Sequence, residues 1–207
     1  MELNEEEAAR LREELSRTSI LDEGHPIISG LPELDQFLSS RGGIRYGRVI
    51  EWGAPMGRCS RFLILRFLRD LGEAVVWVYG QKEEIKIYAP AWASQGVDLS
   101  LFYFIRSRTP LPDLRPLFLE PAFRIMVIDC PQKLSAGDWS FICAKARENK
   151  QLIFVLRPFF LSPKRGNPLV YFRLNCWLKP NIGKYNLKFL KGGEGSIEVP
   201  LSMVRDQ

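Results

Sequence analysis

Short runs of consecutive apolar residues alternate with helical stretches between residues 48 and 157, and this alternation restricts the fold more than any other feature. The runs read RVIEW, AVVWVYG, LFYFI, RIMVIDC and QLIFVLR. Because they are continuous and do not alternate with polar residues, we expect strands that are buried on both faces. The intervening segments, such as residues 58–72 and 135–150, are typical of helices. The pattern therefore predicts an α/β fold with a mostly parallel sheet flanked by helices.

Three further apolar runs follow without a helical stretch between them, at residues 169–178, 184–191 and 196–203. They alternate more clearly with polar residues, which favours antiparallel strands at one edge of the sheet. A chain of 207 residues is long enough for one well-buried α/β domain. We predict that residues 25–207 form this core and that residues 1–24 form an N-terminal helix and a linker.

The composition disfavours several classes of protein. The four cysteines form no CxxC pair and there is one histidine, so we expect no metal site and no cysteine or serine hydrolase chemistry. The sequence contains no run of 18 or more apolar residues, so we expect no membrane-spanning helix. The N-terminus also lacks the apolar core of a signal peptide. We expect a cytoplasmic protein that has no membrane partner.

Charge is distributed unevenly along the chain. The net charge is +5, but residues 1–24 carry three arginines against eight acidic residues, whereas residues 151–207 carry nine basic residues against three acidic ones. Such asymmetry indicates two different partners or head-to-tail self-contact. The acidic end has a capping-box spacing at Asn4 and Glu7 and predicts a helix. Its narrow apolar stripe is compatible with two arrangements: the helix lies on its own domain, or it docks on another chain.

The loop after the first predicted strand, in EWGAPMGRCSRFL, occupies the place of a phosphate-binding loop. Aligned on Gly53, the motif GxxxxGK[ST] is matched at Gly53 and Ser60. Arg58 stands where the second glycine belongs, Cys59 replaces the lysine, and Gly57 comes one position early. Without the lysine, the loop lacks the ammonium group that neutralises phosphates.

Asp129 ends the RIMVIDC strand, where the fold would place a carboxylate that orients magnesium. A carboxylate at the end of a parallel strand is common, and it can equally cap the next segment. The sequence leaves both interpretations open.

The segment SGLPELDQFLSSRGGIRYGRVIEW, residues 29–52, resembles the segment that leads into the ATP site of RecA-type recombinases. The short length, the YAPAWASQGVD segment and the trailing strands are more specifically similar to the ImuA family of bacterial mutagenesis cassettes. The resemblance implies a P-loop NTPase core of RecA type. It also implies a role in DNA-damage-induced (SOS) translesion synthesis beside ImuB, an inactive Y-family polymerase relative, and indirectly beside an error-prone replicative-type polymerase. RecA itself is a further candidate partner, and the alternative function is that of a SulA-like cell-division inhibitor.

The resemblance also shows where this chain departs from active recombinases. The glutamate that activates water in RecA corresponds to Gln81, which cannot act as a base, although Glu83 and Glu84 lie close by in sequence. We therefore expect a vestigial nucleotide site, no ATP turnover and no bound cofactor. The residues of this site are Gly53, Gly57, Arg58, Ser60, Gln81 and Asp129.

The sequence offers one candidate surface for DNA and two for a partner protein. The second DNA-binding loop of RecA corresponds to RPFFLSPKRGNP, which interleaves cations with aromatic rings at Arg157, Phe159, Phe160, Lys164 and Arg165. This pattern suits single-stranded DNA, but it also fits a turn whose rings pack on the core. RecA-type proteins pack their N-terminal helix on a neighbour, so Leu3, Leu11 and Leu15 are the first candidate partner surface. The second candidate comprises Lys179, Lys184, Lys188 and Lys191.

Overall fold

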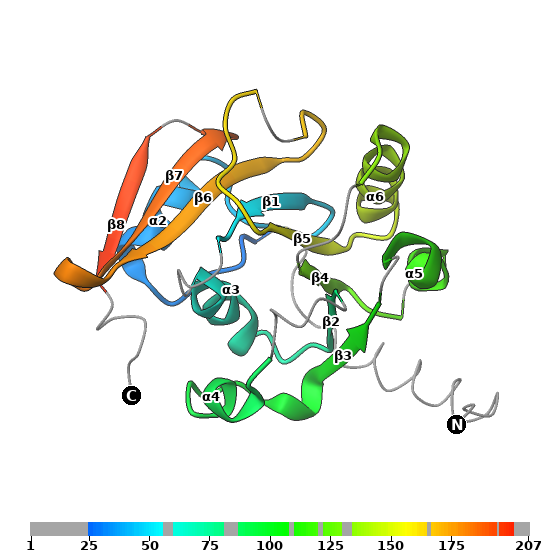
Figure 1. Ribbon diagram of the computed structural model, residues 1–207, viewed down its shortest axis with the longest axis horizontal. Coiled ribbons are helices and arrows are strands. Elements are labelled where there is room, and N and C mark those ends of the chain that lie inside the picture. The colour runs from blue at the N-terminus through cyan, green and yellow to red at the C-terminus, as the bar shows by residue number, and fades with distance from the viewer. Residues whose placement is uncertain are drawn as a thin grey trace.

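The computed structural model describes residues 25–55, 60–80, 87–107, 110–119, 122–129, 134–164, 167–193 and 195–200. These residues build one eight-stranded sheet in the order β3-β2-β4-β5-β1-β6-β7-β8 (Figure 1). The strands are β1 Val49–Gly53, β2 Val75–Tyr79, β3 Phe102–Arg106, β4 Ile125–Asp129, β5 Leu152–Arg157, β6 Phe172–Lys179, β7 Lys184–Lys191 and β8 Ser196–Pro200. The predicted α/β class and the mostly parallel sheet are confirmed.

The first six strands of that order run parallel to one another. Strand β7 pairs antiparallel with β6, and β8 pairs antiparallel with β7. The predicted antiparallel edge is therefore confirmed, with one refinement. The first of the three trailing runs, β6, pairs in parallel with β1 on one side and antiparallel with β7 on the other. The chain reaches this position through the long segment between β5 and β6, in which no helix is described.

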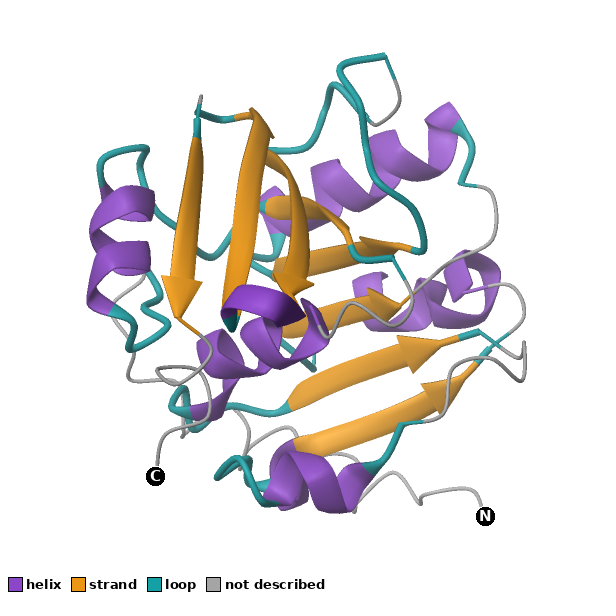
Figure 2. Ribbon diagram, turned by 60° about the vertical axis from the view of Figure 1, so that its left-hand side comes forward, coloured by secondary structure: helices purple, strands orange, loops and turns teal. Residues whose placement is uncertain are grey.

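Helices cover both faces of the parallel part of the sheet (Figure 2). The helices are α2 Pro32–Ser39, α3 Ser60–Arg69, α4 Ala89–Ala93, α5 Pro110–Leu119 and α6 Ala136–Glu148, with short 3-10 turns η1 Leu99–Leu101 and η2 Pro180–Ile182. Buried side chains of α2, α3 and α4 pack on one face, and those of α5 and α6 pack on the other. Successive side chains of a strand point to opposite faces of the sheet, so neighbouring residues of a strand pack into the cores on opposite faces.

Local sequence accounts for the helix ends. Helix α6 begins with a complete capping box, in which Ser135 and Asp138 bond each other's backbone N–H groups. Gly72 follows α3 with a φ of +64°, which favours glycine after a helix. Helix α4 begins at Ala89 with Pro90 in its first turn, where a proline loses no hydrogen bond.

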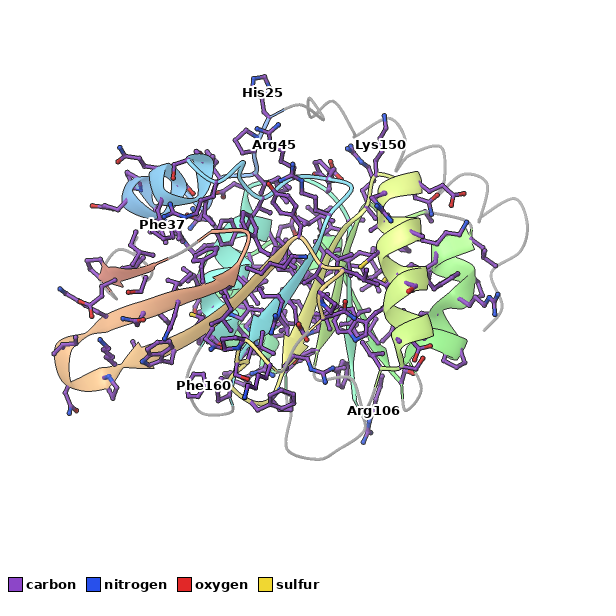
Figure 3. The ribbon with its side chains drawn as sticks, turned by 90° about the horizontal axis from the view of Figure 1, so that it is seen from above. His25, Phe37, Arg45, Arg106, Lys150 and Phe160 are labelled. Carbon is purple, nitrogen blue, oxygen red and sulfur yellow. The ribbon has the colours of Figure 1, made fainter. Side chains whose placement is uncertain are left out.

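The carboxyl ends of the parallel strands lie at one end of the molecule. Figure 3 shows Arg106 and Phe160, which end or follow parallel strands, at the opposite end from His25 and Lys150. Among the described residues, no helix is long and apolar enough to cross a membrane. The predicted N-terminal helix, with Leu3, Leu11 and Leu15, lies outside the described residues.

Candidate functional site

Asp129 is fully engaged by two neighbouring side chains. Arg61 donates from Nε to Oδ2 at 2.7 Å and from Nη2 to Oδ1 at 2.6 Å, which makes a bidentate ion pair. The indole of Trp77 donates a third hydrogen bond, from Nε1 to Oδ2 at 3.2 Å. The carboxylate is buried, at 1% exposure. Both of its oxygens therefore accept hydrogen bonds from the protein itself.

The fold brings these three residues together although they are far apart in sequence. Asp129 ends β4 and alternates onto the same face as Ile125 and Val127, the face on which α3 packs. Trp77 lies on the adjacent strand β2, and Arg61 is in the first turn of α3. The arginine therefore reaches the carboxylate from the helix that directly follows the predicted phosphate loop.

This arrangement does not fit a magnesium ion at Asp129. Magnesium binds through carboxylate oxygen lone pairs in a near-ideal octahedron, and a guanidinium is a permanent cation that matches a carboxylate bidentately. Arg61 therefore already supplies the positive charge that a metal would supply. Elsewhere in the described residues, no three His, Cys, Asp or Glu side chains are grouped as metal ligands would be.

The remaining residues of the predicted nucleotide site are placed only in part. Ser60 begins α3 and is buried, at 1% exposure, and its hydroxyl has no hydrogen-bond partner among the described residues. Gly57, Arg58 and Gln81 lie outside the described residues. The structure thus places Gly53, Ser60 and Asp129.

Gly53 has a packing role on the opposite face of the sheet. A Cβ at this position would lie 2.1 Å from Oδ1 of Asn175 and 3.1 Å from the carbonyl oxygen of Phe159. The Asn175 side chain is itself fixed, because it accepts from the N–H of Leu161 at 2.7 Å and donates to its carbonyl at 2.9 Å. Glycine at the end of β1 is therefore required by the close approach of Asn175 and the segment after β5.

Glu51 organises a buried charge cluster beside Gly53. Its carboxylate lies 3.8 Å from Nε of Arg157 and 3.5 Å from Nε of Arg173, and it accepts the backbone N–H of Asn167 at 2.8 Å. The guanidinium of Arg157 also lies over the ring of Phe159, 5.1 Å from its centroid. An adjoining cavity of about 400 Å³ is lined by Glu51, Ala136, Trp139, Arg157, Phe159, Asn167 and Pro168. Arg157, predicted to contact DNA, is thus half-buried, with its side chain 16% exposed and held beside Glu51.

The other residues of the predicted DNA loop point outward. Phe159 and Phe160 are 39% and 46% exposed, and Lys164 is exposed. The neighbouring Leu161 is buried and anchors the loop. Arg165 lies outside the described residues. Of the two alternatives for this loop, a turn whose two rings pack on the core therefore fits less well than an exposed pair of rings.

The four lysines of the predicted partner surface differ in their surroundings. Lys179 and Lys184 both approach Glu198, at 2.7 and 3.5 Å. Lys191 donates to the carbonyls of Pro168 and Val170 and ties the loop to the sheet. Lys188 is exposed and has no ion-pair partner among the described residues. Lys188 is therefore the best placed of the four to meet another molecule.

Arg61 is the most important residue that the sequence reasoning missed. A signal was present, because a cation in the first turn of a helix faces the positive end of the helix dipole, and α3 has no acidic residue there. A cation at this position is disfavoured unless a specific anionic partner compensates its charge. The exposed Ile182 and the half-buried Trp177 were also missed, because short hairpin sequences give no sign of which apolar side chains stay exposed.

Comparison with known proteins supports the fold. No protein-family model matches the chain, and no curated protein matches its sequence. Among solved structures, a crystal structure of the RadB recombinase is similar, with a TM-score of 0.66 over 86% of this chain and 97% of that chain. The fold is RecA-like. At 14% sequence identity the similarity concerns the RecA-like core alone.

Proposed function

We propose that this chain is a non-catalytic RecA-like adaptor in DNA-damage-induced translesion synthesis. In this role it binds an inactive, ImuB-like relative of the Y-family polymerases and thereby supports an error-prone polymerase. The observation that carries the non-catalytic part is the bidentate pair between Arg61 and Asp129. The family resemblance of residues 29–52 and the RecA-like core support the repair context.

The chemical argument combines the ion pair with the altered loop. Phosphoryl transfer depends almost entirely on positioning and on cations that stabilise the transferring phosphoryl group. Here the loop has Cys59 in place of the lysine, and Asp129 is neutralised by Arg61. The loop thus lacks its lysine, and the carboxylate that would orient a metal is already paired with Arg61.

The first experiment measures nucleotide binding and turnover by the full chain. We expect no magnesium-dependent ATP hydrolysis above the buffer blank and no saturable binding of a fluorescent ATP analogue, with RecA recombinase as the positive control. Asp129→Ala should leave this baseline unchanged. Hydrolysis that Asp129→Ala abolishes would remove the non-catalytic assignment.

The second experiment tests the partner. The full chain, co-expressed with an ImuB-like protein, should co-purify with it, and an unrelated RecA-like protein of similar charge serves as the control. Failure of the two chains to associate at any salt concentration would reject the adaptor function, whatever the result of the ATP assays.

A second candidate, binding of single-stranded DNA, is favoured by the exposure of Phe159 and Phe160 beside Lys164. Bases stack on exposed rings while cations meet phosphates. This function predicts oligothymidylate binding that weakens steeply with salt and decreases in a Phe159→Ala variant. Tyr88→Ala, which removes an exposed ring outside this loop, is the matched control.

A further inference from the structure

An apolar groove lies between the loop after β5 and the β6–β7 hairpin. It has a volume of about 540 Å³. One side is formed by Phe160, and the hairpin supplies the remainder, including the turn η2. The residues that line it are Phe160, Asn175, Trp177, Leu178, Lys179, Pro180, Asn181, Ile182 and Lys188. Figure 3 shows Phe160 at the end of the molecule to which the carboxyl ends of the parallel strands point.

Large apolar side chains remain open to solvent here. Phe160 is 46% exposed and Ile182, at the tip of the hairpin, is 53% exposed. The hairpin holds Ile182 in this position because Gly183 adopts a left-handed conformation, with φ of 60°, directly after it. Exposed apolar residues that line one depression are typical of an interaction site, whereas isolated ones are common on any surface.

The rim of the groove is positive. Lys179 and Lys188 line it, and no carboxylate does. Glu198, on the adjoining strand β8, is already shared by Lys179 and Lys184. Three lysines thus stand against one glutamate, and Lys188 retains an uncompensated charge. The complement of this surface is an acidic ligand, because charges of opposite sign across an interface steer association and specify the partner.

The arrangement of the rings favours a peptide over a nucleic acid. Phe160 and Trp177 pack edge to face, with centroids 5.4 Å apart and planes at 80°. The two rings therefore cannot sandwich a base between them, and a nucleic acid would have only single-ring stacking on Phe160 here. Leu178, Pro180 and Ile182 supply aliphatic surface, which accepts a leucine or phenylalanine side chain well.

We propose that this groove binds an acidic peptide segment of a partner protein, anchored by a large apolar side chain between Phe160, Trp177 and Ile182. Lys179 and Lys188 meet its carboxylates. The proposal rests on the proposed function in one respect, namely that an adaptor acts by binding another protein.

The test selects peptides without knowledge of the partner. A library of random twelve-residue peptides on phage is selected on the full chain and counter-selected on Ile182→Asp. We expect the recovered peptides to contain several Asp or Glu residues together with Leu, Phe or Trp. Their affinity should fall about tenfold or more on Lys188→Glu and weaken with salt. Leu119→Asp changes an equally exposed apolar residue on α5, and Lys150→Glu changes an exposed lysine at the opposite end of the molecule from Phe160 (Figure 3). Both controls should bind as the unmodified chain does.

Several results would overturn the proposal. One such result is that the selection recovers no peptide whose binding depends on Ile182. Another is that the Ile182-dependent peptides are neutral or basic. Binding of oligothymidylate that is lost on Ile182→Asp would assign the groove to single-stranded DNA. Groove-dependent binding of a synthetic peptide of residues 1–24 in preference to all selected peptides would assign it to this chain's own acidic end.

The groove and the adaptor function can fail separately. If Ile182→Asp retains the ImuB-like partner, the adaptor function stands and the groove is not its surface. If acidic peptides bind but no ImuB-like partner does, the groove stands and the proposed pathway fails.

Discussion

Arg61 and Asp129 are separated by 68 positions in sequence, yet they form a bidentate ion pair with donor–acceptor distances of 2.6 and 2.7 Å. The two residues differ in burial, since the Asp129 side chain is fully buried and that of Arg61 is 19% exposed. This difference makes the effect of removing one partner unequal to that of removing the other. An uncompensated charge costs most where solvent cannot reach it.

The first prediction concerns this asymmetry. Arg61→Met leaves a buried carboxylate with one remaining donor, Trp77, and should lower the free energy of unfolding by about 3–5 kcal/mol. Asp129→Asn should cost less, because Arg61 can turn its guanidinium toward water. Urea unfolding at neutral pH measures both.

The double variant supplies the control for the ion pair. Replacing both residues, as Arg61→Met with Asp129→Asn, removes the buried charges together and should restore most of the stability lost in Arg61→Met. If the two single losses simply add in the double variant, the residues do not stabilise each other as the geometry indicates.

The second prediction concerns Gly53. Gly53→Ala places a methyl group against Oδ1 of Asn175 and the Phe159 carbonyl, and should destabilise the protein by roughly 1–3 kcal/mol. Gly137→Ala is the matched control, because a Cβ there would meet only the Ser135 hydroxyl at 3.7 Å and alanine suits a helix. Thermal unfolding distinguishes them. Equal stability of both variants would show that Asn175 yields easily and that Gly53 has no packing role.

The sequence predicted the central strands well for a simple reason. Continuous apolar runs such as residues 125–128 and 152–156 are buried on both faces, and few structures other than a parallel sheet bury a short segment in this way. The pairing of β6 could not be predicted equally well. Its buried residues alternate with polar ones because Arg173 and Asn175 face Glu51 and Gly53 across the parallel pair, and that partner is chosen by the tertiary fold.

For the candidate site, the sequence predicted where the residues lie along the strands and helix α3, but not which side chains they contact. Gly53, Ser60 and Asp129 do lie near the carboxyl ends of strands and the start of α3, as the motif indicates. Their contacts could not be deduced, because a spacing motif assigns a residue to a loop but not to a face. Asp129 faces α3, whereas Gly53 faces Asn175 on the other side of the sheet.

The third prediction uses the tryptophans as reporters of the groove. Trp52, Trp77, Trp92 and Trp139 are buried, whereas Trp177 is half-buried. Acrylamide should therefore quench mainly Trp177, and Trp177→Phe should remove most of the quenchable emission. Trp139→Phe is the control and should leave it. Binding of a selected acidic peptide should reduce the quenching; if Trp177→Phe leaves quenching unchanged, the groove is not open to solvent as described.

The fourth prediction concerns alkaline stability and the buried phenol of Tyr46. Its hydroxyl donates to Oε1 of Glu73 at 2.9 Å, and the Arg124 guanidinium lies over its ring, 4.0 Å from the centroid. Burial, and then the negative charge of Glu73, raise the pKa of Tyr46 well above its usual range. Above a pH of about 10 the unfolded chain therefore loses this proton while the folded chain keeps it.

Stability from Tyr46 is therefore complete below a pH of about 10 and is lost as the pH rises toward the higher native pKa, by at most about 1.4 kcal/mol per pH unit. Urea unfolding between pH 9 and pH 11 should show a shallower decline for Tyr46→Phe than for the unmodified chain. Other tyrosines and lysines titrate in the same interval, so the difference between the two chains is the quantity that matters. Tyr88→Phe, at a position that is 67% exposed, should follow the unmodified chain. Parallel curves for all three proteins would mean that the Tyr46 phenol ionises as readily in the folded chain as in the unfolded one, contrary to its burial against Glu73.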